Sequence, residues 1–440
     1  MDYAGAVDFL ESFANFEKET AVYPEAFKLE RMRALMKDLG NPQNAFESVI
    51  IAGSKGKGST ASILSSILRM ENLRTGLYTS PHLVDVRERI QVNGLWMNEI
   101  RFVETLTRIQ KAVEGYAWRK NPPTYFEVLT AMAFCHFKEM KTQVAVLEVG
   151  LGGLYDSTNV APAKVVGITP ISLEHTDKLG KTLSKIAVQK CGVIKGREAV
   201  VTAAQAPEVM SILEATCDDR EAKLYTVGKE IKVTERDFSE DVQRFDVRTP
   251  WAGYYDLELH LRGAHQLQNA AQAIGLAKAL GDKTRLSVSE DAVKQGVLDA
   301  RWAGRLEKVG DRPRIVLDGA HNTDSVRKML DGVKRHFHFS SLIVVFGSSS
   351  DKDVDGMLQG ITAEADRLVL TQARHPRALP VPEILSRFEG ATKKVYSENT
   401  PAEAIKKARS LASADDLILI TGSLYLVAEA RLELFGGQPF

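Results

Sequence analysis

A segment rich in glycine and lysine at residues 53–60 carries the residue types that bind nucleotide phosphates. An apolar run typical of a buried strand precedes it, and apolar residues at helical spacing follow it to residue 70. Backbone N–H groups at its glycines and at the helix N-terminus would face phosphate oxygens, Lys57 would reach the outer phosphates, and Ser59 would bind Mg²⁺. Because Gly58 separates Lys57 from Ser59, the strict phosphate-loop pattern fails, and a flexible basic turn is the alternative.

Polar residues also follow two later strand-like runs. Glu148 lies near the end of the run at residues 144–149 and could be a metal ligand, or only a helix cap or loop anchor. His175 lies in the loop after residues 165–169 and could be a ligand or a structural histidine. Parallel sheets bind ligands at the carboxyl ends of their strands, so Ser59, Glu148 and His175 together predict one common site.

The elements that would position these residues alternate between short apolar runs and amphipathic stretches, which predicts an α/β fold with a mostly parallel sheet. We expect strands at residues 48–52, 144–149, 165–169 and 199–202, and helices at residues 60–70, 126–140, 184–194 and 268–280. Between residues 233 and 261 the pattern alternates, which predicts an antiparallel or mixed edge.

A second α/β rhythm follows residue 301, with strands expected near residues 315–317, 341–346, 367–370 and 417–420. The sequence therefore predicts two domains, residues 1–298 and 299–440. No long linker separates them, so we expect a ligand-binding cleft between the two.

Composition and charge narrow the function further. The 440 residues include 57 Lys and Arg against 57 Asp and Glu, which does not favour a strongly basic nucleic-acid-binding protein. No apolar run approaches the roughly 20 residues that cross a bilayer, and the N-terminus lacks a secretory or transit pattern, so we expect a cytoplasmic protein. The three cysteines form no C-x-x-C pair and predict reduced, mostly buried thiols.

Several further segments, together with the loop at residues 53–60, resemble the Mur ligase superfamily. They lie at residues 148–153, 156–159, 174–176, 190–195, 263–266, 269–271 and 302–307. The segments Asp-Gly-Ala-His-Asn at residues 318–322 and Thr-Gly-Ser-Leu-Tyr at residues 421–425 narrow the resemblance to its folylpolyglutamate synthase and dihydrofolate synthase branch. The matching segments occur in the family's order between residues 28 and 431.

The resemblance implies an N-terminal P-loop-type domain with a mostly parallel sheet, which binds ATP and carries folate-binding loops, and a smaller C-terminal Rossmann-like α/β domain. The implied activity is that of an ATP-dependent acid–amino-acid ligase, in which ATP phosphorylates the carboxylate of a folate or dihydropteroate and the amine of L-glutamate attacks the acyl phosphate. The ATP-binding residues implied are Gly53, Ser54, Lys55, Gly56, Lys57, Gly58, Ser59, Thr60, Asn269, Arg305, Asp318 and His321.

The resemblance also implies one or two Mg²⁺ ions, held by Ser59, Glu148, His175 and Lys190. Lys57, His175 and Lys190 would be the catalytic residues, with Lys190 carbamylated by CO₂. Carbamylation needs a neutral amine and therefore a buried site with a lowered pKa. A solvated lysine on a helix is the alternative for Lys190.

Two segments match the family's pterin and aminobenzoate side, where an aromatic wall suits a flat ring. They contain Ser80, Pro81 and His82, and Tyr125, Phe126 and Glu127. Both could instead be core turns. Lys55 and Leu154 stand where the family usually has other residues, and could change the substrate preference without changing the reaction.

Two other functions stay open at this point. One is a Mur-type ligase that acts on a different acid, such as a peptide or a cofactor precursor. The other is a P-loop switch or binding protein that closes on a nucleotide without making a product, although motifs spread from residue 53 to residue 321 argue against it. We expect a monomer that acts on small molecules, with neither nucleic acid nor membrane as a partner.

Overall fold

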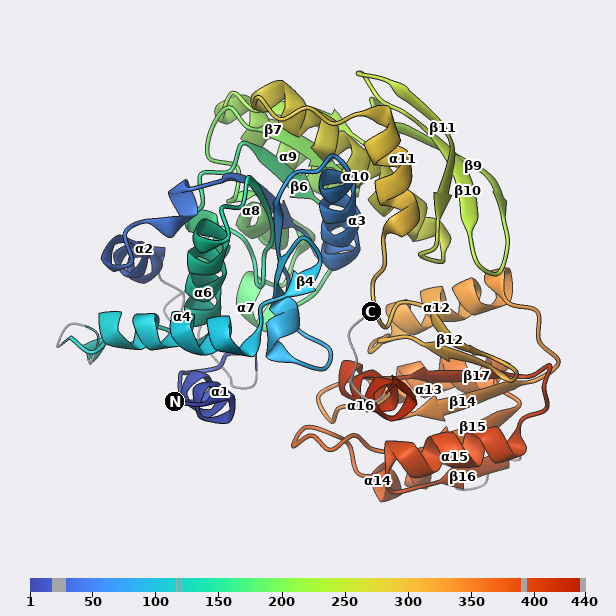
Figure 1. Ribbon diagram of the computed structural model, residues 1–440. Helices are drawn as coiled ribbons and strands as arrows, with labels where there is room; N and C mark the ends of the chain where they lie inside the picture. The colour runs from blue at the N-terminus through green and yellow to red at the C-terminus, as the bar shows by residue number, and fades with distance from the viewer. Residues whose placement is uncertain (18–28, 116–117, 119, 389–393, 436–440) are drawn as a thin grey trace.

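The computed structural model describes residues 1–17, 29–115, 118, 120–388 and 394–435. It has a large N-terminal domain and a smaller C-terminal domain, each built on its own mostly parallel sheet (Figure 1). The α/β fold class predicted from the sequence is confirmed. Nowhere in the described ranges is a helix long and apolar enough to cross a membrane.

The sheet of the N-terminal domain has eight strands among the described residues, in the order β4-β3-β2-β5-β1-β6-β7-β8. Strands β2, β5, β1, β6, β7 and β8 run parallel, and β3 and β4 form an antiparallel edge. The strands are β1 (Glu47–Ala52), β2 (Thr75–Tyr78), β3 (Ile90–Val92), β4 (Leu95–Trp96), β5 (Val144–Glu148), β6 (Val165–Ile168), β7 (Ala199–Thr202) and β8 (Lys223–Thr226). The four strands predicted in this domain are therefore found within one residue at each end.

Helices cover both faces of this sheet, which is why its central strands are apolar throughout. In β1, Ile50 packs toward one layer of helices and Val49 and Ile51 toward the other. The first layer contains α1 (Tyr3–Glu11), α2 (Leu29–Asp38), α4 (Glu99–Ala112), α6 (Tyr125–Glu139), α8 (Leu183–Cys191) and α9 (Pro207–Asp219). The second contains α3 (Lys57–Met70), α10 (Ala264–Lys283) and α11 (Glu290–Asp299).

The alternating segment forms a separate antiparallel sheet rather than an edge of the main one. Its strands are β9 (Lys232–Phe238), β10 (Gln243–Arg248) and β11 (Gly253–Leu259), in the order β11-β10-β9. The inward residues Phe245, Val247 and Leu257 are buried in the same apolar cluster as α10 and α11. The antiparallel prediction is confirmed, and burial against helices explains why these strands have no partner in the large sheet.

The sheet of the C-terminal domain has the order β12-β13-β17-β14-β15-β16, with β12 antiparallel and the rest parallel. Its strands are β12 (Glu307–Asp311), β13 (Arg314–Leu317), β14 (Leu342–Phe346), β15 (Arg367–Leu370), β16 (Lys394–Ser397) and β17 (Leu417–Thr421). One face packs on α12 (Thr323–His336), α13 (Val354–Glu364) and α14 (Val381–Leu385), and the other on α15 (Pro401–Leu411) and α16 (Leu424–Phe435).

The three cysteines, Cys135, Cys191 and Cys217, are free and buried, as the sequence predicted. Cys191 ends α8, which therefore stops three residues before the predicted end. At the next residue, Gly192, a Cβ atom would lie 2.5 Å from the Leu154 side chain. The close contact with Leu154 therefore favours glycine at the point where the helix ends.

Candidate active site

A cleft of about 1680 Å³ lies between the two domains. Its walls come from the loops that follow β1, β2, β5 and β6 in the N-terminal domain and β13, β14, β15 and β17 in the C-terminal domain. The carboxyl ends of both parallel sheets therefore meet at one cavity, which is where open α/β sheets bind ligands.

The loop after β1 has the geometry of an anion site. Helix α3 begins at Lys57, and its N-cap Gly56 has a φ of 88°, in the left-handed region that favours glycine. A Cβ on Gly56 would lie 2.6 Å from Oδ1 of Asn269, and one on Gly58 would lie 2.6 Å from the Trp302 ring. The loop is thus packed as tightly as glycine permits, with its backbone N–H groups at the start of α3.

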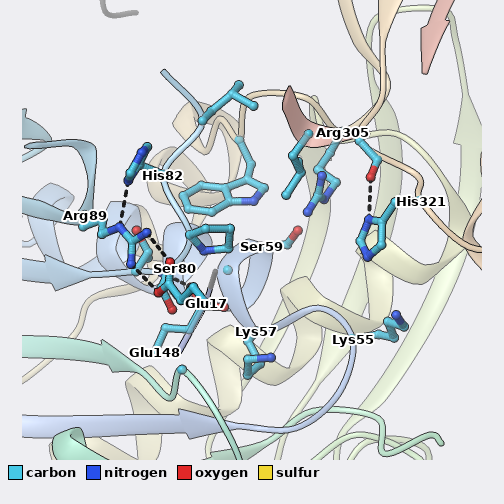
Figure 2. Close-up of a pocket in the computed structure, with 18 of the residues that line it drawn as sticks. Glu17, Lys55, Lys57, Ser59, Ser80, His82, Arg89, Glu148, Arg305 and His321 are labelled. Carbon is cyan, nitrogen blue, oxygen red and sulfur yellow. Dashed lines mark hydrogen bonds and ion pairs between the residues drawn. The ribbon is translucent and has the colours of Figure 1, made fainter. Parts of the chain in front are cut away.

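The predicted loop residues do not all face the cleft. Those that line it are Ser54, Lys55, Gly56, Lys57, Gly58 and Ser59. Gly53 and Thr60 lie behind them, and the Thr60 side chain is fully buried. Among the described residues, no hydrogen bond or ion pair holds the Lys57 ammonium, and Figure 2 shows it beside Ser59 and Glu148.

Glu148 is the buried acid of this wall, with 4% of its surface exposed. Its Oε2 accepts a hydrogen bond from the Ser80 backbone N–H at 3.1 Å, and no described residue donates to Oε1. Burial raises the pKa of Glu148, and Lys57 opposes that shift. A buried carboxylate with a free oxygen, lining the same cavity as the Ser59 hydroxyl, fits a hard divalent cation, which takes oxygen ligands and keeps some of its waters.

His175 lines the cleft in the left-handed region, with a φ of 47°, as the N-cap of the short helix α7 (Thr176–Leu179). Burial lowers its pKa, so the imidazole is neutral near pH 7 and has a lone pair to offer a ligand. Ser59, Glu148 and His175, predicted to share a site, all face the same cavity.

Lys190 does not line the cleft but lies behind it, only 2% exposed. Its Nζ donates hydrogen bonds to the Gly53 carbonyl at 2.7 Å and to Oε1 of Glu174 at 2.9 Å. Burial and then the neighbouring Lys57 lower the pKa of Lys190 to about 8, against the opposing effect of Glu174. Burial would raise the pKa of Glu174, but Lys57 and Lys190 together lower it to about 2. Lys190 is therefore a buried, ion-paired amine and not the solvated lysine that was the alternative.

The C-terminal wall brings Arg305, Asp318 and His321 to the cleft opposite the loop after β1. Both oxygens of Asp318 accept backbone hydrogen bonds, from Leu306 N–H at 2.9 Å and Ala320 N–H at 2.8 Å. Nδ1 of His321 bonds the Gly319 carbonyl at 2.8 Å, and Nη1 of Arg305 donates to the Gly304 carbonyl at 2.9 Å. Burial lowers the pKa of His321 to about 4.

Asn269, on α10, completes the predicted nucleotide set. Its Nδ2 donates to Oε1 of Gln266 at 2.9 Å, and it lines the cleft beside Gly56. Figure 2 shows Lys55 on the side of the cavity where His321 and Arg305 lie. The residues predicted from two distant parts of the chain therefore face one another across a single cavity.

The six residues predicted on the pterin side, Ser80, Pro81, His82, Tyr125, Phe126 and Glu127, all line the cleft. Beside them lies Arg89, 1% exposed, whose guanidinium donates to both oxygens of Glu17 at 2.7 Å and to Nδ1 of His82 at 2.9 Å (Figure 2). The guanidinium carbon is 5.6 Å from the centroid of the Tyr125 ring. This part of the cleft combines aromatic faces with a fixed cation.

Glu127 has a different environment from its neighbours. Its Oε2 accepts from Nε of Arg31 at 2.7 Å and from the Thr124 backbone N–H at 2.7 Å, and its Oε1 accepts from the same Nε at 3.0 Å, in a capping box at the start of α6. Both acceptor oxygens are thus occupied by protein donors. Its position at the cleft follows from this capping role.

Sequence reasoning missed three groups that the fold assembles. Glu174 pairs with Lys190 across 16 residues, and Glu17 pairs with Arg89 across 72 residues. The third group is an aromatic stack on the C-terminal wall, where the rings of His375 and Tyr425 lie 3.7 Å apart at 10°, and Arg377 bonds the Tyr425 hydroxyl. Of these residues, only Glu174 gave a local signal, because it lies beside His175 in a segment that resembles the family.

Comparisons with known proteins agree with the resemblance noted in the sequence. Residues 51–277 match the Mur ligase middle domain, and residues 304–424 match the Mur ligase, glutamate ligase domain. The chain is 33% identical over 408 residues to the dihydrofolate synthase/folylpolyglutamate synthase of Bacillus subtilis (strain 168), covering 92% of this chain and 94% of the relative. It is also 33% identical over 449 residues to the folylpolyglutamate synthase of Lacticaseibacillus casei, covering 100% of both chains.

A solved structure of Mycobacterium tuberculosis folylpolyglutamate synthase complexed with ADP superposes with a TM-score of 0.89 at 32% identity, over 100% of this chain and 99% of the other. The likeness therefore extends over both domains and the cleft between them. The chain belongs to the Mur ligase superfamily, in the branch of the folylpolyglutamate synthases and dihydrofolate synthases.

Proposed function

We propose that the protein is an ATP-dependent ligase that joins L-glutamate to a folate, to dihydropteroate or to both, with release of ADP and phosphate. The observation that carries this proposal is the pair formed by Lys57 and Glu148, at the loop where glycines are closely packed. Among the described residues, the Lys57 ammonium has no partner and the buried Glu148 carboxylate has one free oxygen. The names of the relatives and the complex with ADP support the same activity.

In this mechanism, backbone N–H groups at the start of α3 bind the phosphates of ATP, and Lys57 neutralises the charge that develops on the γ-phosphate. A carboxylate oxygen of the acid attacks the γ-phosphorus, and the bond to the β-phosphate oxygen breaks to release ADP. The amine nitrogen of glutamate then attacks the carbonyl carbon of the acyl phosphate. Phosphate leaves, the amine loses a proton, and an amide bond remains. Because no side chain forms a covalent bond, the protein acts through positioning and charge neutralisation.

We assign a Mg²⁺ site to Ser59, Glu148 and His175, which offer two oxygen ligands and a neutral imidazole to one cavity. When bound, Mg²⁺ would neutralise phosphate charge and align the phosphates. We also propose that Lys190 takes up CO₂, which replaces its ammonium with an anionic carbamate near a second cation. Its lowered pKa supports this, because a neutral amine is needed for the reaction. As a carbamate, Lys190 would lose the hydrogen bonds that its ammonium donates to the Gly53 carbonyl and to Glu174.

The two remaining ligands have distinct places in the proposal. The acid would lie against the Phe126 ring, with Arg89 nearby as a fixed cation; the Tyr125 ring, 1% exposed, lies behind this wall. Glutamate would enter along the C-terminal wall, where the buried Nε of Arg377 has no hydrogen-bond partner among the described residues and can donate to a carboxylate. This arrangement brings an acid, a nucleotide and an amine to one cavity from three sides.

We keep the domain boundary between residues 298 and 299, supported by the end of α11 at Asp299 and by the two family matches on either side. Because both walls of the cleft come from a single chain, we propose that the enzyme acts as a monomer. A cytoplasmic location would suit three free, buried thiols.

The test is release of ADP by purified protein with ATP, Mg²⁺ and glutamate, in the presence of a folate, of dihydropteroate or of an unrelated acid. We expect ADP release only when a folate or dihydropteroate is present together with glutamate. Release with another acid alone would favour a Mur-type ligase of different specificity. Nucleotide binding without any product would instead favour a switch protein.

A further inference from the structure

The two domains meet again outside the catalytic loops, at the turn between β9 and β10. This turn, residues 239–242, reaches the end of α12, as Figure 1 shows for the tip of the three-stranded sheet. The Glu240 carboxylate accepts from Nζ of Lys308 at 3.2 Å and from Nε of Arg314 at 3.0 Å, both in the C-terminal domain. The Ser239 carbonyl lies 3.3 Å from Nδ1 of His336. A hairpin of the N-terminal domain is thus held on three sides by the C-terminal domain.

Arg262 lies at the centre of this contact, between the end of β11 and the start of α10. It is 9% exposed. Its Nε donates to the Glu240 carbonyl at 2.6 Å, and its Nη1 donates to the Leu306 carbonyl at 2.9 Å. Its guanidinium carbon lies 5.2 Å from the centroid of the Phe337 ring. One buried side chain therefore joins the hairpin turn, α10 and the segment that leads into the C-terminal domain.

Two residues connect Arg262 to the nucleotide side of the cleft: Leu306, which accepts its hydrogen bond, and Gly263, which follows it in the chain. Leu306 follows Arg305, and its backbone N–H donates to Oδ2 of Asp318 at 2.9 Å. Gly263 is the N-cap of α10, the helix that carries Asn269. The Gly263 N–H donates to Nε2 of His336 at 3.1 Å, so the start of α10 is itself bonded to the C-terminal domain.

Burial of an arginine costs free energy that is recovered only where its donors are well placed. Here the planar guanidinium spans two carbonyls of different domains, which the single ammonium of a lysine on a flexible stem could not do with equal rigidity. Arg262 therefore fixes the distance between α10 and the segment at residues 305–318. These two segments carry Asn269 on one side of the cleft and Arg305 and Asp318 on the other.

We propose that Arg262, which also lines the cleft, is a positioning residue for the nucleotide: it sets the spacing of the two halves of the ATP site through its bonds to the Glu240 and Leu306 carbonyls. This inference rests on the proposed function to the extent that ATP binds in this cleft. It does not depend on which acid is the substrate. It predicts that loss of Arg262 weakens nucleotide binding while the pterin side, which is lined by the loop after β2 and by α6 and not by the three-stranded sheet, keeps its affinity.

The experiment compares Arg262→Ala and Arg262→Lys with Arg244→Ala. Arg244 lies on β10 of the same small sheet, but it is half-exposed and its ion pairs with Asp237 and Glu258 remain within that sheet. The Kd for ADP is measured by titration without acid or glutamate, the KM values for ATP and acid are measured in turnover, and thermal unfolding reports the fold.

For Arg262→Ala we expect the Kd for ADP and the KM for ATP to rise at least about 10-fold, equivalent to about 1.4 kcal/mol. The KM for the acid should stay within about 2-fold of wild type, because a change of this size corresponds to less free energy than the loss of one hydrogen bond. Arg262→Lys should recover part of the loss, and Arg244→Ala should match wild type.

An unchanged Kd for ADP in a folded Arg262→Ala variant would overturn the proposal, as would equal losses for ATP and acid. If Arg262→Ala does not fold, Arg262→Lys decides: an intermediate ADP affinity supports the positioning role, and full ADP affinity refutes it. Failure of the proposed function would appear differently, as a wild-type protein that binds ADP but forms no amide from any acid tested.

Discussion

The two walls of the cleft use their charged residues in opposite ways. On the N-terminal wall, Lys57 has no partner among the described residues, and Glu148 keeps one carboxylate oxygen free. On the C-terminal wall, Asp318, His321 and Arg305 each bond a backbone group of their own wall. Lys57 and Glu148 are thus available for ligands, whereas Asp318, His321 and Arg305 hold the shape of their own wall. Substitution of Lys57 should therefore cost activity alone, and substitution of Asp318 should cost stability as well.

The largest effect is expected for Lys57→Ala. Lys57 can neutralise the negative charge that develops on the γ-phosphate during the reaction. Its loss should therefore lower kcat at least about 10²-fold. Because no internal bond is lost, the unfolding temperature should stay within about 2 °C of wild type, since surface substitutions without partners change stability little. Steady-state ADP release and thermal unfolding measure the two quantities. Near-normal turnover would remove the phosphate-loop argument, and a large drop in stability would contradict the contrast between the walls.

Lys190 is expected to come next. Lys190→Ala should lower kcat about 10²-fold if an anionic carbamate is needed near the metal, and Lys190→Arg should not restore activity, because a guanidinium stays positive and does not take up CO₂. Full activity in Lys190→Arg would exclude the carbamate. Added short carboxylates should recover part of the activity of Lys190→Ala.

The pH dependence of Lys190 gives an independent measurement. With a pKa of about 8, the amine is mostly ammonium at pH 7 and mostly neutral at pH 9. At constant dissolved CO₂, the carbamate signal in ¹³C NMR should therefore rise between pH 7 and pH 9, and it should be absent from Lys190→Arg. A signal that falls over this range would contradict the assignment.

How much of this site the sequence could predict depends on the length of chain that separates interacting residues. The strand, turn and helix around Gly56 are local, so glycine spacing and apolar periodicity were enough to place them. The Arg89 pair with Glu17 and the stack of His375 on Tyr425 need the complete topology, because neither residue of each pair belongs to a local pattern that points to the other. Glu127 shows the opposite difficulty, since its motif is local but its carboxylate is engaged in capping α6.

For single strands, the prediction depended instead on how apolar the strand is. Strand β15 was predicted at its observed ends because the apolar residues 368–370 follow Arg367 directly and are bounded by polar segments. Strand β12, which has only half-buried and exposed residues, gave no such signal and was not predicted. Its place at the antiparallel edge beside β13 explains why, because an edge strand needs little apolar surface.

Asp318→Asn should have a mixed effect. The amide keeps one oxygen acceptor, but its NH₂ group faces a backbone N–H of Leu306 or Ala320, so one of the two hydrogen bonds is lost. We expect the KM for ATP to rise about 10-fold and the unfolding free energy to fall by about 1–2 kcal/mol, the cost of leaving one buried donor unpaired. Nucleotide titration and chemical denaturation test both parts. A loss of ATP affinity at full stability would place Asp318 in the same class as Lys57.

The smallest effect on activity is expected at Glu127, which the sequence grouped with the pterin site. Its carboxylate is held by Arg31 and by the Thr124 N–H, and the side chains of both members of the ion pair are 8% exposed. Glu127→Ala removes one partner of a buried ion pair, which costs about 3–5 kcal/mol where such a pair is broken. Glu127→Gln keeps the oxygen that accepts from the Thr124 N–H and should cost less stability, so the unfolding temperature should be highest for wild type, lower for Glu127→Gln and lowest for Glu127→Ala.

At a temperature where wild type and both Glu127 variants are folded, kcat should stay within about 3-fold of wild type, a change of under 1 kcal/mol in the barrier. A loss of turnover in Glu127→Gln as large as in Lys57→Ala would show that this carboxylate acts on the substrate and that its bonds to Arg31 and Thr124 are not its main role.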